Sequence, residues 1–397
     1  MIFCKRGRFF ILLTRFIILC AAGVAFFIAA LWIEHRSEIT LPLATGPYNV
    51  GRAHMAWSES SPVPTDQPML VWIWYPAAGR PDVEKTTSFL PPELAAAAMH
   101  NQAWVINLVT HDLSKVRAHG IDGAPLAPKP RSFPVLLMRG GASAPVWNYT
   151  TLAENLASYG YVVVGFDIPY RTKTVVLANG TVATRPPEND PELAAERHDN
   201  AIVQRLLDAW THDLSHAVNH LTRLNASDPA GLFTGRLDLG RIGVFGHSFG
   251  GTAAVQFCVS DPRCCAGVDI DGGMFGSAAN ATIHQPFMFL LGDHHRENGP
   301  ESAAIMHDLQ AVYDRSPAAT RKFVIIPGAN HLFFSDDGAH LKSHVILGAL
   351  RWLRIVEIDG SRQLAQTANY LRSFFETALP PPKLVDTTEG ASMTSRK

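Results

Sequence analysis

A serine flanked by glycines is the strongest chemical signal in the chain. Ser248 stands in GHSFGG (246–251), after the strand-like run RIGVF and before TAAVQFCV, which suits a helix. A tight strand-to-helix turn brings backbone close to the serine, so it requires glycine two positions before and after it. Such a turn presents the hydroxyl at the carboxyl edge of a sheet, above a helix N-terminus. An ordinary glycine-rich turn is the alternative, but the flanking elements favour Ser248 as a nucleophile.

A histidine late in the chain is placed to take the proton of that serine. His331 stands in PGANHLF (327–333), directly after the last predicted strand. The chain holds seventeen histidines, so the residue type alone means little. Because the carboxyl ends of parallel strands share one edge, this imidazole is expected beside the serine. We therefore expect His331 to act as the base, against the alternative of a loop histidine without chemistry.

A carboxylate must orient that imidazole, and two candidates fit. Asp271 ends the strand AGVDI, one strand after the serine, and Asp293 ends FMFLLG, one strand later. Both satisfy the chain order serine, aspartate, histidine that α/β-hydrolases show. Asp269 is a weaker third choice because it lies inside its strand. The residues alone leave the choice between Asp271 and Asp293 open.

Two backbone N–H groups should stabilise the negative oxygen that forms during ester cleavage. One is expected from Phe249, directly after the serine. The other should come from RGGA (139–142), which follows the strand PVLLM. Gly141 is the preferred donor there and Gly140 the next, while an ordinary turn is the alternative reading.

Strands and helices alternate from residue 133 onward, as in a mostly parallel sheet with helices on both faces. This is the α/β-hydrolase fold that the Ser248 turn requires. A further strand is expected at 69–75 and a helical insertion at 91–119. The expected strands of the repeating part are 134–138, 161–166, 241–245, 266–270, 287–291 and 323–326, and the expected helices are 149–159, 191–224, 339–355 and 361–379.

Four segments are expected along the chain. Residues 1–36 form a short basic cytoplasmic stretch and a membrane anchor or signal segment. The Pro-, Gly- and Ser-rich residues 37–67 form a stalk. Residues 68–379 form the catalytic domain, and 380–397, which have no hydrophobic period, form a disordered tail.

The N-terminus predicts export. Four basic residues between positions 5 and 15 precede an uncharged apolar run, 16–33, which as a helix would rise about 27 Å, roughly one hydrocarbon thickness. Positive charge before the run and Glu34 after it predict a single span with the catalytic domain outside the cytoplasm, periplasmic or extracellular. A cleaved signal peptide is the alternative, because Ala29 and Ala30 offer small residues near a cleavage site.

Cysteine usage agrees with an oxidising compartment. Cys258 and Cys264 flank an Asp-Pro turn between a predicted helix and strand, so a disulfide between them is expected. Buried thiols are the alternative. Three histidines at helical spacing, His212, His216 and His220, could face a metal, but no carboxylate or thiolate accompanies them in the pattern, so a solvated or core-edge face is favoured.

Composition excludes several other classes of protein. The 397 residues are 47% hydrophobic and 17% charged, as in a globular protein. The formal net charge of −1 gives no field that favours nucleic acid. Neither a phosphate-binding loop nor a dinucleotide fingerprint occurs in the sequence. No cofactor, metal or obligate protein partner is expected.

Five segments together resemble the plasma or type II family of platelet-activating factor acetylhydrolases, and bacterial relatives described as dienelactone-hydrolase-like. The resemblance spans residues 133–350, and for the acid it implies Asp271, with Ser248 and His331 as its partners and Phe249 and Gly141 as oxyanion donors. One departure is Arg139, where the family often has histidine, which would change the polarity of the pocket. The segments are GHSFGG, AGVDIDGGMF (266–275), GANHLFF (328–334), RGG (139–141) and YVVVGFD (161–167).

The resemblance implies a serine hydrolase that cleaves carboxylic esters through an acyl-enzyme. It further implies short or oxidised acyl groups on phospholipid-like esters, which a membrane tether would suit. A broad carboxylesterase, lactone hydrolase or polyester hydrolase would use the same three residues. An inactive relative that serves as a binding module is a more distant alternative, since the chain retains a full set of catalytic side chains.

Overall fold

The computed structural model describes residues 2–58, 68–79, 85–177, 180–293, 300–341, 344–353 and 357–382. By its internal contacts the chain divides into two compact units. Unit 1 combines residues 1–40, 88–117 and 340–355, and unit 2 combines 41–87, 118–339 and 356–397. Each unit is therefore assembled from segments that lie far apart in the sequence.

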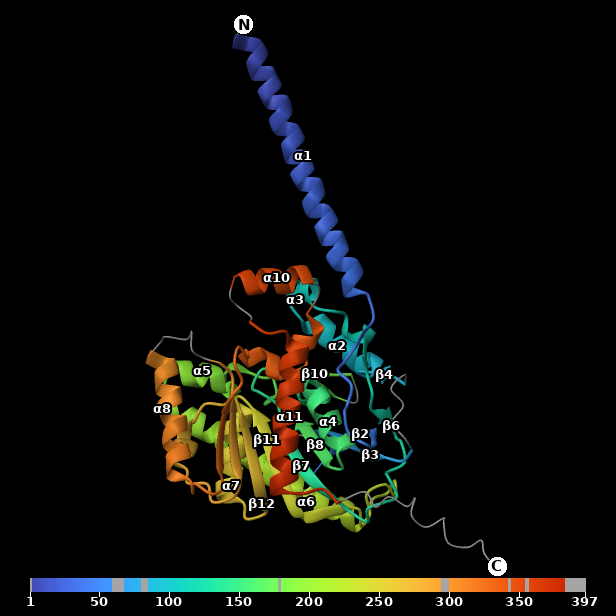
Figure 1. Cartoon of the computed structure of the whole chain (residues 1–397), viewed down its shortest axis with the longest axis vertical. Coiled ribbons are helices and arrows are strands. Elements are labelled where there is room, and N and C mark those ends of the chain that lie inside the picture. The colour runs from blue at the N-terminus through green and yellow to red at the C-terminus, as the bar shows by residue number, and fades with distance from the viewer. Residues whose placement is uncertain are drawn as a thin grey trace, which may run out of the picture. The chain divides into compact units, whose positions relative to one another are not determined.

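Unit 2 is built on a nine-stranded sheet in the order β14-β13-β12-β11-β7-β8-β3-β2-β6 (Figure 1). The run from β14 to β8 is parallel throughout, whereas β3 is antiparallel to both of its neighbours. The strands are β2 (Asn49–Trp57), β3 (Met69–Ala77), β6 (Ile121–Asp122), β7 (Phe133–Arg139), β8 (Val162–Asp167), β11 (Leu237–His247), β12 (Cys264–Ile270), β13 (Phe287–Leu291) and β14 (Arg321–Ile325).

Helices cover both faces of this sheet. Every residue of β7, β8 and β13 is buried, which explains why these strands are apolar except for Arg139 at the end of β7 and Asp167 at the end of β8. Side chains alternate between the faces along each strand. Helices α6 and α7 pack together on one face, and α4 and α11 lie side by side on the other (Figure 1). The α-helices of unit 2 are α4 (Thr150–Ser158), α5 (Pro191–Glu196), α6 (Asn200–Ala226), α7 (Phe249–Ser260), α8 (Pro300–Arg315), most of the short α9 (Asp337–His340) and α11 (Gly360–Ala378).

Between residues 172 and 226 the observed secondary structure differs from the predicted one. The helix expected at 191–224 is two helices, α5 and α6, because His198 between them has a positive φ of 52° and cannot continue a helix. Asp199 then caps α6 by accepting the N–H of Ile202 at 3.1 Å. Between β8 and α5 lies a small antiparallel hairpin of β9 (Thr174–Val176) and β10 (Val182–Thr184), for which no strand was predicted.

The prediction of a stalk at 37–67 is wrong for residues 49–57. Residues 49–57 form β2, which pairs with β3 over nine residues and belongs to the main sheet. Residues 59–67 of the expected stalk and 383–397 of the expected tail lie outside the described residues. The boundary of the sheet domain therefore lies earlier in the chain than residue 68.

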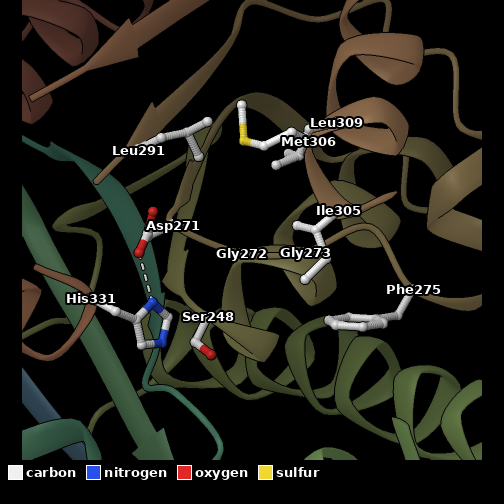
Figure 2. Close-up of a pocket in the computed structure, with 10 residues that line it drawn as sticks. All are labelled: Ser248, Asp271, Gly272, Gly273, Phe275, Leu291, Ile305, Met306, Leu309 and His331. Carbon is white, nitrogen blue, oxygen red and sulfur yellow. Dashed lines mark hydrogen bonds and ion pairs between the residues drawn. The ribbon is translucent and has the colours of Figure 1, made fainter. Parts of the chain in front are cut away.

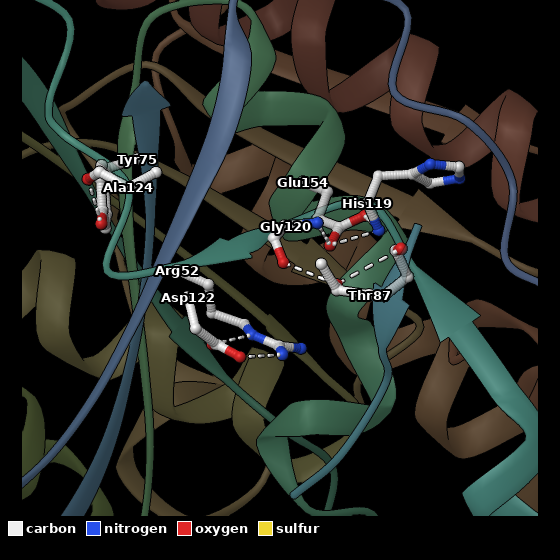
Figure 3. A network of polar contacts seen from close by, with 9 residues as sticks. Arg52, Tyr75, Thr87, His119, Gly120, Asp122, Ala124 and Glu154 are labelled. Carbon is white, nitrogen blue, oxygen red and sulfur yellow. Dashed lines mark hydrogen bonds and ion pairs between the residues drawn. The ribbon is translucent and has the colours of Figure 1, made fainter. Parts of the chain in front are cut away.

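A partly buried polar network ties the β2–β6 edge of the sheet to α4 (Figure 3). Arg52 on β2 donates to both carboxylate oxygens of Asp122 on β6, at 2.8 and 2.9 Å. Glu154 on α4 is fully buried and accepts the backbone N–H groups of His119, at 3.2 Å, and Gly120, at 2.6 Å. Burial raises the pKa of the Glu154 carboxyl, and these hydrogen bonds offset part of that effect.

Unit 1 contains the long N-terminal helix. Helix α1 (Ile2–His35) includes a stretch, Leu12–His35, that is long and apolar enough to cross a membrane. Its last turn is held by α3, because His35 Nδ1 lies 2.7 Å from the carbonyl of Thr110 and Asp112 N–H donates to the carbonyl of His35 at 2.8 Å. The other elements here are α2 (Pro92–Asn101), α3 (Trp104–Val109), α10 (His344–Trp352), β1 (Ile39–Thr40) and most of β5 (Val116–Ala118).

Candidate active site

Ser248 occupies a strained turn between β11 and α7. Its φ of 56° lies in the left-handed region, which an L-residue rarely adopts. A side-chain carbon at Gly246 would collide with the carbonyl of Gly250, and one at Gly250 would collide with the carbonyl of Gly140. The glycines of the sequence motif are therefore needed because three backbone segments meet around Ser248.

His331 and Asp271 form a hydrogen-bonded pair. Nδ1 of His331, at the start of η5 (His331–Phe334), lies 2.6 Å from Oδ2 of Asp271, directly after β12. The other oxygen, Oδ1, accepts the N–H of Gly292 at 2.7 Å, and the Asp271 side chain is only 1% exposed. Asp271, like Ser248, has a positive φ, of 52°. The carboxylate is thus held from two sides, and it fixes one nitrogen of the imidazole.

The loop that carries His331 is clamped by α11. The side-chain amide of Gln363 accepts the N–H of Asn330 at 2.9 Å and donates to the carbonyl of Asn330 at 2.7 Å. Gln363 itself is buried. The imidazole therefore sits on a braced turn, which suits a group that must keep a defined orientation.

Ser248, Asp271 and His331 line one cavity of about 240 Å³ (Figure 2). In this view the imidazole lies between the carboxylate of Asp271 and the Ser248 side chain. No hydrogen bond joins the Ser248 hydroxyl to His331 within the described part of the chain. The remaining lining is glycine and apolar side chains from three further elements: Gly272, Gly273, Phe275, Leu291, Ile305, Met306 and Leu309.

The other two carboxylates considered from the sequence have different surroundings. Asp293 accepts the N–H of Gly328 at 2.8 Å, and its own N–H donates to Ala329 at 3.0 Å, so it braces the loop that precedes His331. Asp269 is fully buried and accepts the N–H of Gly272 at 3.0 Å. Burial raises the pKa of Asp269 well above its usual value. The carboxylate hydrogen-bonded to the imidazole is that of Asp271.

The two expected oxyanion donors lie in different environments. Phe249 is the first residue of α7, where backbone N–H groups have no partner within the helix. Gly141 lies against the turn, because a side-chain carbon on it would be 3.4 Å from Cβ of Ser248. However, the N–H of Gly141 donates to the hydroxyl of Tyr149 at 3.0 Å. Sequence reasoning did not identify Tyr149, which is buried at the end of η2 (Val146–Tyr149).

Arg139 does not change the polarity of the cavity as its position in the motif led us to expect. Its guanidinium is buried in the core, 4.7 Å from the ring centre of Phe166 and 4.1 Å from that of Trp210. Nη1 donates to the carbonyl of Phe166 at 2.9 Å. Burial lowers the pKa of Arg139 to about 10, partly opposed by the carboxylate of Asp213. The side chain is therefore part of the packing behind β7.

The structure also shows where Cys258, Cys264 and the three histidines of α6 lie. The structure contains a disulfide between Cys258, near the end of α7, and Cys264, the first residue of β12. The histidine rings on α6 lie near one another, and the ring of His220 stacks on Trp57 with centroids 5.0 Å apart. Within the described residues no group of three metal-binding side chains is suited to hold an ion.

Fold and site together define the class. A parallel sheet covered on both faces presents Ser248 and the His331–Asp271 pair from turns that follow β11, β14 and β12, at its carboxyl edge. This architecture is that of the α/β hydrolases. The family model for platelet-activating factor acetylhydrolase, isoform II, matches residues 33–191 and 197–370. The chain therefore belongs to that family.

Two curated relatives agree with this family. A probable 1-alkyl-2-acetylglycerophosphocholine esterase from Arthroderma benhamiae is 27% identical over 256 residues, which are 62% of this chain and 60% of that protein. The platelet-activating factor acetylhydrolase of Cavia porcellus is 23% identical over 353 residues, 79% of this chain and 74% of that protein. The match thus spans about 60% of the length of the Arthroderma relative.

A solved structure supports the fold. The ferulic acid esterase from Streptomyces cinnamoneus superimposes with a TM-score of 0.68, covering 88% of this chain and 96% of that one. Sequence identity is 22%. At this level of identity the likeness concerns the architecture, and it carries nothing about substrate.

Proposed function

We propose that the protein hydrolyses carboxylic esters through an acyl-enzyme formed on Ser248. The observation that carries this proposal is the His331–Asp271 hydrogen bond of 2.6 Å, made in the same cavity that Ser248 lines. Because Nδ1 of His331 is occupied by Asp271, the other ring nitrogen, Nε2, is left to serve the serine. Ser248 is the nucleophile, His331 the general base and Asp271 the residue that orients it.

The reaction proceeds in two steps of acyl transfer. Nε2 of His331 takes the proton of the Ser248 hydroxyl as Oγ attacks the ester carbonyl carbon. The N–H of Phe249, at the start of α7, stabilises the resulting oxyanion, with Gly141 as the second donor. The bond to the alcohol oxygen then breaks, and His331 returns its proton to the leaving alcohol. Water, deprotonated by the same imidazole, attacks the acyl-enzyme and releases the acid.

The cavity supports short acyl groups. Its volume is about 240 Å³, and the lining beyond the three polar side chains is apolar, with Phe275, Leu291 and Met306 among its members. An apolar chamber favours a short alkyl chain over a charged head group, which would remain outside. Together with the names of the curated relatives, this supports phospholipid-like esters with short acyl chains as substrates.

Attachment to a membrane supports the same substrate class. We propose that α1 spans the bilayer with its N-terminus in the cytoplasm, and that the catalytic domain is exported. Unit 1, which contains this helix, also exposes two large apolar side chains: Trp104 on α3 is 78% exposed and Trp352 on α10 is 82% exposed. Tryptophan is the residue most favoured at a membrane–water interface. Carbonate extraction of membranes, followed by protease treatment of intact cells, tests both the anchor and its orientation.

The decisive experiment is covalent labelling with a fluorophosphonate, read by intact mass. The wild-type protein should gain one adduct and lose ester hydrolysis, and Ser248→Ala should gain none while keeping its fold. Ser260→Ala, at the exposed far end of the same helix, is the matched control and should label like wild type. An adduct on another serine, or more than about a thousandth of wild-type activity in Ser248→Ala, would overturn the assignment.

Substrate profiling separates the proposed specificity from a broader one. Rates on nitrophenyl esters of increasing acyl length, measured beside an acetyl-phospholipid, should fall steeply once the acyl chain exceeds the cavity. A flat profile would indicate a broad carboxylesterase, and complete absence of labelling would indicate a binding module.

A further inference from the structure

Tyr149 joins the turn that should hold the oxyanion to the residue before the nucleophile. Its hydroxyl lies 3.0 Å from the N–H of Gly141 and 2.7 Å from Nδ1 of His247. A backbone N–H is only a donor, so the tyrosine oxygen accepts from Gly141. The phenolic proton remains available to His247 when Nδ1 of that ring carries no proton. The direction of this second hydrogen bond depends on the tautomer of His247, and we assign Nδ1 as its acceptor.

The state of His247 agrees with this direction. The side chain is buried, and burial lowers its pKa to about 3, with the charge of nearby His331 acting in the same sense. The imidazole is thus neutral, and in the tautomer with its proton on Nε2, Nδ1 accepts the proton of Tyr149. The rings of His247 and His331 are packed against each other, with centroids 4.5 Å apart. A neutral His247 adds no repulsion when His331 becomes charged during proton transfer.

A chain of contacts therefore runs through the site from one side to the other. It begins at Gly141 N–H, passes through Tyr149 and His247, crosses the ring contact to His331 and ends at Asp271. Ser248 directly follows His247 and lies 3.4 Å from the position of a side-chain carbon on Gly141. Each residue proposed to act in catalysis, except Phe249, belongs to this series of contacts or is adjacent in the sequence to a residue that does.

We propose that Tyr149 is a positioning residue for acyl transfer, whose hydroxyl holds the Gly141 amide and the His247 ring in fixed places around Ser248. This inference rests on the proposed function. One N–H can be shared between two acceptors. The Gly141 N–H can therefore donate to an oxyanion while its hydrogen bond to Tyr149 holds the N–H in a fixed orientation. The hydroxyl acts through Gly141 and His247, and it touches neither substrate nor the reacting atoms.

Tyr149→Phe removes the hydroxyl and keeps the ring. Because preorganised donors count chiefly in the transition state, kcat should fall about 10- to 100-fold, while KM stays within about twofold of wild type. The variant also leaves two buried polar groups without a partner, so its melting temperature should fall. A loss of stability alone would not produce the split between kcat and KM.

Tyr161→Phe is the matched control. Tyr161 is also fully buried, and its hydroxyl makes one hydrogen bond, to the carbonyl of Leu379 at 3.1 Å. It precedes β8, at the amino edge of the sheet, whereas the site lies at the carboxyl edge. Tyr161→Phe should lose stability and keep wild-type kcat and KM when assayed well below its melting temperature.

Two further measurements keep the inference falsifiable. Fluorophosphonate labelling of Ser248 in wild type tests the proposed function by itself, so its failure is distinguishable from failure of the Tyr149 role. In wild type, nitrogen chemical shifts of His247 should show a neutral ring with an unprotonated Nδ1 between pH 5 and 8. The inference is overturned if Tyr149→Phe matches Tyr161→Phe in kcat, if only its KM changes, or if His247 titrates in that range.

Discussion

Nδ1 of His331 lies 2.6 Å from Oδ2 of Asp271, although sixty residues separate them in the chain. The two residues follow β14 and β12, which are both neighbours of β13, so the sheet brings their turns to one edge. Gly292, at the end of β13, donates its N–H to the second oxygen of Asp271. The intervening strand thus positions the acid, which explains why a carboxylate two strands from the histidine can reach it.

The acid assignment predicts unequal effects of two matched substitutions. Asp271→Asn should lower kcat by about 10⁴-fold, because an amide cannot stabilise the imidazolium and favours the wrong tautomer. Asp293→Asn alters a brace of the loop, through its bond to Gly328, and should change kcat by less than about tenfold. Steady-state kinetics on one short ester decide the point. The reverse order of effects would transfer the role to Asp293.

The glycines of the turn predict a steric result. Gly250→Ala would drive a methyl group into the carbonyl of Gly140, so the turn must open and activity should fall at least about 100-fold. Gly348 lies inside α10 with open space around it, so Gly348→Ala should raise stability by about 0.5–1 kcal/mol and leave kcat unchanged. Thermal denaturation and ester assays on both variants provide the comparison. Normal activity in Gly250→Ala would show that the close approach of the two backbones is unnecessary.

The cavity lining predicts a change in acyl preference. Met306 on α8 lines the cavity and is partly buried, so Met306→Ala should enlarge the chamber. The ratio of kcat/KM for six- to eight-carbon acyl chains over acetyl should rise by about tenfold, since each buried methylene contributes roughly 0.8 kcal/mol. Met288→Ala removes a fully buried methionine of β13 outside the cavity lining and should leave the ratio unchanged. Equal profiles for both variants would argue that the acyl chain binds elsewhere.

Asp167 predicts a pH dependence of stability. Its carboxyl is buried, which raises its pKa to about 6 from the usual value of 3.8, although hydrogen bonds from Val146 and Thr172 oppose the shift. A raised pKa in the folded state means that the stabilisation is full below pH 3.8 and is lost as the pH rises through 6. At 1.36 kcal/mol per pKa unit, the contribution is about 3 kcal/mol.

Asp167→Asn removes this titration. Denaturant unfolding at several pH values should show the wild type losing about 3 kcal/mol more than the variant between pH 4 and 7. Other buried carboxyls titrate in both proteins, so only the difference between the two curves is informative. Parallel curves would mean that Asp167 is ionised throughout.

Much of the candidate active site at the carboxyl edge of the sheet could be predicted, because short sequence patterns indicate it. The Ser248 turn has its own glycine pattern, and the strands that lead to it are continuous apolar runs whose bounds were close to those observed. His331 followed from its place after the last strand. The choice of Asp271 over Asp293 came only from the family resemblance, because hydrogen bonding between distant turns leaves no local trace in the sequence. The membership of the family is confirmed by its sequence model.

Features that depend on distant contacts could not be predicted. Tyr149 has no local signal, because its importance arises from His247, which is 98 residues away. Residues 49–57 were predicted as part of a stalk, although they form β2, in which residues 50–52 are buried and residues 53–56 alternate between half-buried and exposed. Their small and polar residues hid the strand, and pairing with β3 decides its structure. The break between α5 and α6 could have been found from Asp199, a favoured helix-capping residue.

The last turn of α1 limits how many N-terminal residues can be removed without loss of packing in unit 1. Leu31 and His35 are buried in unit 1, and His35 bonds to the backbone around Thr110. A chain that starts after Thr40 would lose both residues and leave those peptide groups to water, whereas one that starts at Leu31 keeps them. Peptidase cleavage after Ala30 would therefore release the same folded unit that an uncleaved helix retains. Cleavage or retention of residues 1–30 would then change where the protein is located but would leave its fold unchanged.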